Sequence, residues 1–240
     1  MEALLGFGES LVVLIVGLAA RFVLALAVLA LLVVPLLIVF QGVKSYRRVH
    51  DRVLGLGQAG RVPWATGLFY AAGHTWVKEM GEKTLRVGLD GLFQLLFPRM
   101  DSIQLVPVGS VVYRGQSLAE IGYGARRATI AAPVDGRVLG FNPVLSRHPD
   151  LARRDSYRRG WLATIEPLNH EYSTYRTGRA AQAWLEQEDA RLGRFMEHEL
   201  GVAVADGGEF VRPPLTLLSA DQWKELNRQF LGTDPPVDSE

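Results

Sequence analysis

The apolar run from Leu11 to Phe40 constrains this chain more than any other feature. It reads LVVLIVGLAARFVLALAVLALLVVPLLIVF, and Arg21 is its single charge. As one helix the run would be ~45 Å long at about 1.5 Å per residue, whereas the hydrocarbon core of a bilayer is only ~30 Å thick. The apolar run is too short to cross the bilayer twice. We therefore predict one transmembrane helix within residues 11–43, tilted or extended beyond the bilayer at its N-terminal end.

A cleaved signal peptide is the alternative interpretation of this run. The start, MEALLGFGES, lacks a basic region, and the apolar run is longer than a signal peptide needs. No small-x-small cleavage site follows the run. We expect the segment to be retained as an anchor.

The charges that flank the run predict its orientation. Glu2 and Glu9 precede it, and the basic residues follow it, at Lys44, Arg47, Arg48 and Arg52. Basic flanks stay on the cytoplasmic side of a membrane. The prediction is a single-pass protein of the cell membrane, with residues 1–10 outside, residues 44–66 as a basic juxtamembrane linker, and the remainder in the cytoplasm.

Two residues within the run leave alternatives open. Arg21 either extends its guanidinium to the outer headgroups or pairs with an acid on another membrane subunit. Pro35 predicts a kink, because proline removes a backbone donor from a helix.

Composition excludes several classes of function. The formal net charge is +1, which gives no electrostatic case for a nucleic-acid partner. The chain has no cysteine, which excludes disulfides, thiolate metal sites and cysteine nucleophiles. Its histidines lack metal-ligand spacing, and no nucleophile or phosphate-loop motif is present. We expect no metal, no cofactor, no small-molecule substrate and no enzymatic activity.

Short β runs separated by turn residues fill residues 67–169. HTWVKEMGEKTLRVGL predicts a hairpin, and GLFQLLFPRM a helical turn that ends at Pro98. LAEIGY and ATIAAPVDGRVLGFN predict a second hairpin, with its turn at Gly124–Arg127. Such a pattern favours a small β barrel or sandwich.

These residues carry a resemblance to a known family. HTWVKE, the segment Leu85–Ile121, APVDGRVLGFN and DSYRRGWLATIEP resemble, in order and spacing, the H protein of the glycine cleavage system. The later LLSADQWKELNRQFL is similar to the closing helix of that family. The resemblance implies a mainly β fold, the lipoyl-type barrel-sandwich hybrid, here joined to one N-terminal transmembrane helix and to C-terminal helices.

The resemblance also implies a lysine at the hairpin tip, where the family carries lipoic acid as an amide. Counted from Ala119, that position falls on Ala125, and the acidic residue that precedes it in the family falls on Gly122. The adjacent Arg126 and Arg127 are no substitute, because a guanidinium stays protonated and delocalised. Lysines occur only at Lys44, Lys78, Lys83 and Lys224. The sequence thus predicts a carrier fold that has lost its lipoylation position.

Two interpretations of the tip arginines stay open. Arg126 and Arg127 either dock onto an acidic partner surface or are ordinary residues of a solvated turn.

Residues 170–240 form the predicted C-terminal extension, which is helical with a disordered end. Thr177–Leu200 places apolar residues on one side of a helix, including Trp184 and Phe195. That helix either packs on its own barrel or serves as an arm for a partner.

The leading hypothesis is a non-catalytic accessory or scaffold subunit of a larger membrane complex, possibly a respiratory or redox one. The partners would be the other subunits and the lipid bilayer. An alternative is a membrane recruiter that binds a lipoylated protein or a lipoate-handling enzyme. An active lipoyl carrier and a transport adaptor are the remaining alternatives.

Overall fold

The computed structural model describes residues 56–81, 83–200 and 214–232, together with Leu18, Arg21, Phe22, Leu24, Leu29 and residues 31–35. The chain divides into two compact units, Met1–Val53 and Leu54–Glu240. The described residues of the first unit, Arg21 and Pro35 among them, are helical and exposed. Most of the transmembrane helix predicted for residues 11–43 lies outside the described residues. Within the described ones, no helix is both long enough and apolar enough to cross a membrane.

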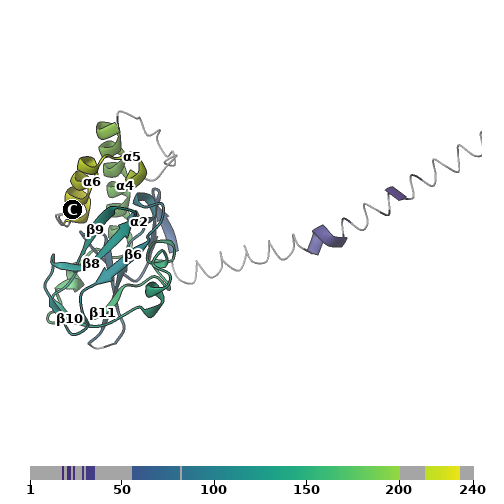
Figure 1. The fold of residues 1–240 in the computed structure, drawn as a ribbon. Helices are drawn as coiled ribbons and strands as arrows, with labels where there is room; N and C mark the ends of the chain where they lie inside the picture. Colours follow the sequence, from purple (N-terminus) through teal and green to yellow (C-terminus); the bar gives the residue numbers. More distant parts are fainter. Residues whose placement is uncertain are drawn as a thin grey trace, which may run out of the picture. The chain divides into compact units, whose positions relative to one another are not determined.

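Antiparallel sheets build the second unit (Figure 1), which confirms the mainly β prediction. The largest sheet has the order β3-β4-β5-β11-β10-β7, with strands Phe69–Ala71, Thr75–Glu79, Leu85–Leu89, Ala163–Pro167, Gly136–Phe141 and Val111–Val112. A three-stranded sheet has the order β6-β8-β9, with strands Ser102–Leu105, Ser117–Tyr123 and Arg126–Ala131. A separate hairpin consists of β1, Leu56–Ala59, and β2, Val62–Ala65.

Helices lie between the strands and after them. α2 spans Leu92–Leu96, as the sequence predicts, and α3 spans Leu151–Arg154. The longest helix, α4, spans Gly178–Leu200. Beyond it come α5 at Pro214–Leu217, α6 at Ala220–Leu226 and a π-helical turn, η3, at Asn227–Leu231. The 3-10 turns η1 and η2 span Pro143–Ser146 and Glu171–Thr174. In Figure 1, α4 and α6 lie at one end of this unit and β10 and β11 at the other.

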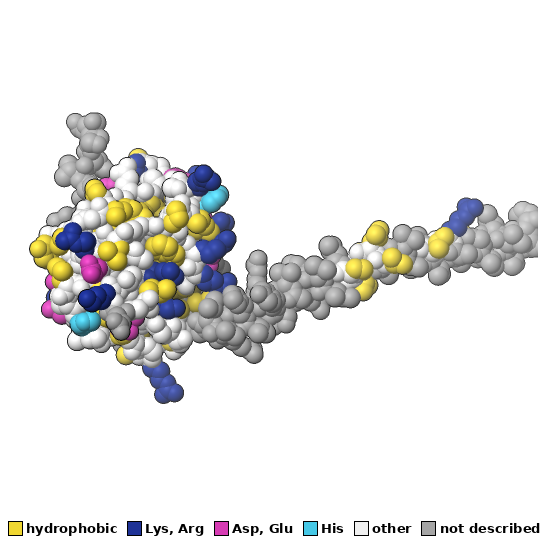
Figure 2. All heavy atoms as spheres, turned by 90° about the horizontal axis from the view of Figure 1, so that it is seen from below, with side chains coloured by type: hydrophobic (Ala, Val, Ile, Leu, Met, Phe, Trp, Pro, Cys, Tyr) yellow, Lys and Arg dark blue, Asp and Glu magenta, His cyan; other side chains and the backbone are white. Residues whose placement is uncertain are grey.

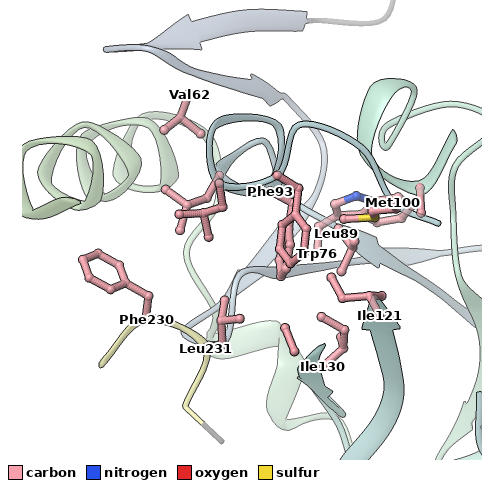
Figure 3. Packing of buried hydrophobic residues seen from close by; sticks show 14 of the residues in the cluster. Val62, Trp76, Leu89, Phe93, Met100, Ile121, Ile130, Phe230 and Leu231 are labelled. Atoms are coloured by element: carbon pink, nitrogen blue, oxygen red, sulfur yellow. The ribbon is translucent and has the colours of Figure 1, made fainter. Parts of the chain in front are cut away.

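The main hydrophobic core joins these elements (Figure 3). Trp76 on β4, Phe93 on α2 and Ile121 on β8 are buried in one cluster with Phe230 and Leu231 of η3. Each of these side chains is almost fully removed from solvent. Because burying a large apolar side chain is worth about 1.5–3 kcal/mol, the C-terminal helices belong to the folded core of the unit.

The structure differs from the sequence expectation at residues 44–66. The sequence predicts a linker, whereas Leu56–Ala65 forms the β1–β2 hairpin. Gly60 makes the tight turn with φ +62°, and Arg61 beside it donates its backbone N–H to Asp189 of α4 at 2.7 Å. Val62 and Trp64 are buried. The hairpin is thus stabilised by a helix far along the chain, which local turn residues do not reveal.

A second difference concerns the run ATIAAPVDGRVLGFN. It forms two strands in different sheets, because β9 ends at Ala131 and β10 begins at Gly136. Pro133 lies between them, and proline cannot donate a ladder hydrogen bond. The chain crosses from one sheet to the other at this point.

Candidate functional site

The β8–β9 hairpin ends in a turn of two residues. Tyr123 pairs with Arg126, which leaves Gly124 and Ala125 in the loop. Gly124 has φ +56°, as the first central position of a type II′ turn requires. Its N–H donates to the carboxylate of Asp101 at 3.0 Å, and this hydrogen bond helps to hold the pKa of Asp101 below its usual value. Ala125 is exposed at the tip, so the turn presents a methyl group.

Arg126 connects the tip to the C-terminal helices. Its Nη2 donates to the carbonyl of Leu218 at 2.7 Å, and its Nη1 donates to the carbonyl of Ser219 at 2.8 Å. Ser219 is the N-cap of α6, where it forms a capping box with Gln222. A charged donor to a carbonyl makes a stronger hydrogen bond than a neutral one. Arg126 therefore fixes the start of α6 against the hairpin.

Arg127 folds back over its own hairpin. Its Nη1 donates to the carbonyls of Gly124 at 2.6 Å and Arg126 at 3.0 Å, and its Nε lies 3.5 Å from Glu120. Gly122 makes room for it, because a Cβ at residue 122 would lie 2.7 Å from Nη1 of Arg127. Arg127, one of the two arginines for which the sequence leaves a partner contact open, thus makes its hydrogen bonds within the turn.

α6 covers the strand behind the tip. The indole N–H of Trp223 donates to the carbonyl of Arg127 at 2.9 Å, and its ring meets Phe97 edge-on with 5.3 Å between centroids. Trp223 is buried. Sequence reasoning identified a closing helix but did not place it on this hairpin, since nothing local in either segment encodes the contact.

The described lysines lie at the β4–β5 hairpin and on α6. Lys78 on β4 and Lys83 just before β5 are exposed near one another, because Lys78 pairs with Arg86 of β5. Lys224 is exposed on α6, the helix that returns to the hairpin. Lys44 lies outside the described residues. The two-residue turn itself contains no amine.

A buried charged cluster lies apart from the tip. His74 and Asp90 are fully buried, and Nδ1 of His74 lies 2.8 Å from Oδ2 of Asp90. Nε2 of His74 is 3.4 Å from the carboxylate of Glu188 on α4, an ion-pair distance rather than a well-formed hydrogen bond. Trp184 of α4 stacks on the imidazole with 5.0 Å between centroids. The cluster joins α4 to the β sheet.

Electrostatics keep His74 protonated. Burial lowers its pKa, but the charges and hydrogen bonds of Asp90 and Glu188 outweigh burial and raise it to about 9. The pKa of Glu188 is raised by burial and lowered more strongly by His74 and Arg191, so it falls below its usual value. Arg191 also lies over the ring of Phe230, 4.2 Å from its centroid. The sequence does not reveal the two acidic partners of His74, because Asp90 and Glu188 come from other segments of the chain.

Phe195 and Trp184, the two aromatic residues that the sequence offers as partner contacts, lie against the folded unit. Phe195 is buried and meets Phe230 edge-on with 5.9 Å between centroids. Trp184 is half-buried between His74 and Arg176, whose guanidinium carbon is 5.0 Å from the indole centroid. The structure thus places α4 on its own β domain, the first of the two interpretations of this helix. In the described part of the chain, no group of three or more His, Asp or Glu side chains is arranged to hold a metal ion.

Comparison with known proteins identifies similar chains. The family model described as Glycine cleavage H-protein matches residues 68–188. The glycine cleavage system H protein of Mycobacterium sp. (strain KMS) is 34% identical over 99 residues, which cover 41% of this chain and 76% of that protein. That of Mycobacterium avium (strain 104) is 33% identical over 99 residues, covering 41% and 75%. A crystal structure of a glycine cleavage system H protein from Mycobacterium marinum matches with a TM-score of 0.45 and 22% identity, covering 52% of this chain and 99% of that one.

Proposed function

The chain belongs to the glycine cleavage H-protein family, and on this premise we propose that its family domain holds partner proteins instead of carrying a lipoyl group. The protein is a non-catalytic accessory subunit of a membrane complex. Residues 11–43 anchor it in the cell membrane, residues 44–55 connect the anchor to the folded unit, and the family domain and the C-terminal helices lie in the cytoplasm.

The turn at Gly124–Ala125 is the observation that carries this proposal. An acyl group needs a primary amine to form a stable amide, and the tip offers the methyl group of Ala125. The flanking arginines cannot replace the amine, because a guanidinium is not deprotonated in proteins. Both arginines also donate to backbone carbonyls. The hairpin is kept as a structural element, while the chemistry of a carrier lacks its acceptor.

The anchor is the second support. The apolar run Leu11–Phe40 and the basic residues after it have the pattern of a single span with a cytoplasmic domain. A rigid domain that is held at the membrane and whose hairpin tip offers no amine suits a role in assembly.

Purification from native membranes tests the accessory role. The full chain, tagged at its C-terminus and expressed at its native level, is extracted in mild detergent and its complexes are sized. We expect other chains to co-purify in fixed stoichiometry. A monomeric species at native expression would contradict the proposal.

A recruiter of lipoate-handling proteins is the second candidate, because the chain keeps the β8–β9 hairpin with an exposed tip. Ala125→Glu places a carboxylate at the exposed tip, where the native side chain is a methyl group. If the tip recruits a lipoylated protein or a lipoate ligase, this variant loses binding in a pull-down from detergent extract. If binding is equal for both chains, the tip is not the contact.

A further inference from the structure

Four large apolar side chains are exposed together at the β7 edge of the six-stranded sheet. The exposed fractions are 57% for Val108, 41% for Val111, 53% for Tyr113 and 43% for Leu139. We call these four residues the β7 edge patch. Figure 2 views the molecule from the end at which β10 and β11 lie and shows hydrophobic side chains among charged ones on this face.

The register of the strands puts the patch on the outer face of the sheet. Val111 pairs with Arg137 of β10, so the two side chains point to the same side. Val112 and Val138 are buried, and the alternation along each strand therefore turns Val111 and Leu139 outward.

Two local features extend the patch. Leu139 lies at a bulge, because the β10–β11 register shifts between Val138 and Gly140, and a bulged residue is left unpaired and pushed from the ladder. Val108 precedes Gly109, whose N–H donates to the carbonyl of Val138 at 2.8 Å. Val108 and Leu139 therefore both lie next to Val138 of β10.

The charged residues beside this patch are balanced, so they favour neither a strongly acidic nor a strongly basic partner. Arg137 donates to the carbonyl of Gly109 at 3.2 Å, and Glu166 of β11 faces it across the ladder. Arg114, next to Tyr113, lies 3.4 Å from Glu171. Aliphatic side chains beside a tyrosine and balanced charges are a composition suited to the boundary between lipid headgroups and acyl chains.

Size argues against a protein on this patch and for a bilayer. A stable protein interface buries about 800 Å² on each partner with about 20–30 residues a side, whereas the patch has four residues. β7 is two residues long, too short to template an added strand.

The length of chain before the folded unit favours the bilayer further. Gln41–Gly55 joins the predicted anchor to β1 and spans at most about 50 Å when fully extended. The folded unit is therefore held at a high effective concentration near the membrane, and a weak contact suffices.

We propose that the β7 edge patch rests on the bilayer, with Val108, Val111, Tyr113 and Leu139 among the lipid headgroups. The inference rests on the proposed function, because it requires the Leu11–Phe40 anchor.

The absence of cysteine from the chain allows a direct test. Val111→Cys, Leu139→Cys and, as the matched control, Gln187→Cys on the exposed face of α4 are each introduced into the full chain and labelled with the fluorophore NBD. The proteins are reconstituted into phosphatidylcholine vesicles with and without doxyl-labelled lipid. A tryptophan emission spectrum like that of the unlabelled chain confirms folding, and two patch positions guard against failure of one variant.

We expect doxyl lipid to quench NBD at residues 111 and 139 at least about twofold more than at residue 187, because patch residues would sit at the headgroup level. Equal, weak quenching at all three positions overturns the inference. A blue-shifted emission at residues 111 and 139 that doxyl lipid does not quench also overturns it, since a protein would then cover the patch. Carbonate washing of the same vesicles separates the two proposals. A chain that washes off refutes the anchor, whereas a retained chain without quenching refutes only the patch.

Discussion

Nη2 of Arg126 donates a hydrogen bond to the carbonyl of Leu218 at 2.7 Å, across the hairpin tip and the start of α6. With the parallel bond to Ser219, it makes the hairpin a support for the C-terminal helices. In a carrier the same hairpin has to stay accessible. This contact holds the start of α6 in place at the hairpin tip.

Replacing this arginine is expected to destabilise the folded unit. Arg126→Ala leaves the carbonyls of Leu218 and Ser219 without their charged donor, and we expect a loss of about 1–3 kcal/mol in the free energy of unfolding. Urea unfolding of the full chain in detergent micelles, followed by tryptophan fluorescence, measures it. The control is Arg154→Ala, which removes a surface ion pair to Asp150 and should cost at most about 1 kcal/mol. Equal effects of the two variants would show that the tip contact is not structural.

Gly122 and Arg127 are expected to be coupled. In Gly122→Ala the new methyl group would lie 2.7 Å from Nη1 of Arg127 and 2.6 Å from Oγ of Ser102. The arginine end is flexible, so we expect it to move away and lose its bonds to the turn, at a cost of about 1 kcal/mol. In an Arg127→Ala background the same change should cost less, which a double-mutant cycle by urea unfolding measures. Additive costs would argue that the guanidinium does not occupy this space.

The stability of the folded unit should fall as pH rises above neutrality. His74 has a folded-state pKa of about 9 against an ordinary value of 6.5, so the folded state binds this proton more tightly than the unfolded state. The stabilisation is complete below pH 6.5 and is lost as pH rises through about 9. One pKa unit corresponds to about 1.4 kcal/mol, and the loss should reach about 3 kcal/mol.

His74→Asn is the matched variant for this prediction. His74 has φ +57°, and asparagine tolerates that backbone conformation better than most residues. We expect the variant to be less stable at pH 6.5 and to show little change up to pH 9. Urea midpoints at intervals across this range measure both chains. An equal slope for the two would assign the pH dependence to another group.

Phe195 is expected to contribute to stability, because its ring is buried against Phe230. Phe195→Ala should cost about 3–5 kcal/mol, and the exposed Gln187→Ala about 0.5 kcal/mol or less. Urea unfolding compares them. A stable Phe195→Ala chain that fails to bind its partners would instead support the interpretation of α4 as an arm.

Local patterns in the sequence predict much of this fold. The short strands, the helical turn before Pro98 and the helix over Thr177–Leu200 follow from periodicity and turn residues, and the structure has β4, β5, α2 and α4 there. The resemblance to a family added the arrangement of strands, which periodicity does not give.

What the sequence did not predict depends on contacts between distant segments. The turn was expected to span Gly124–Arg127, but a positive φ at Gly124 allows a two-residue loop that leaves both arginines in β9. Their bonds run to residues more than ninety positions away or to their own turn. Glu188 looks like a solvated helix residue in the sequence, and only the tertiary packing of α4 brings it to His74, the residue before β4.

Mass spectrometry of the intact full chain tests whether the hairpin has kept its fold and lost its acceptor. The protein is purified from cells supplied with lipoate, beside Ala125→Lys, which restores an amine at the tip. We predict that the native chain has its unmodified mass and that the variant gains a lipoyl adduct on residue 125. A lipoyl adduct on Lys44, Lys78, Lys83 or Lys224 of the native chain would show instead that the protein is a lipoyl carrier.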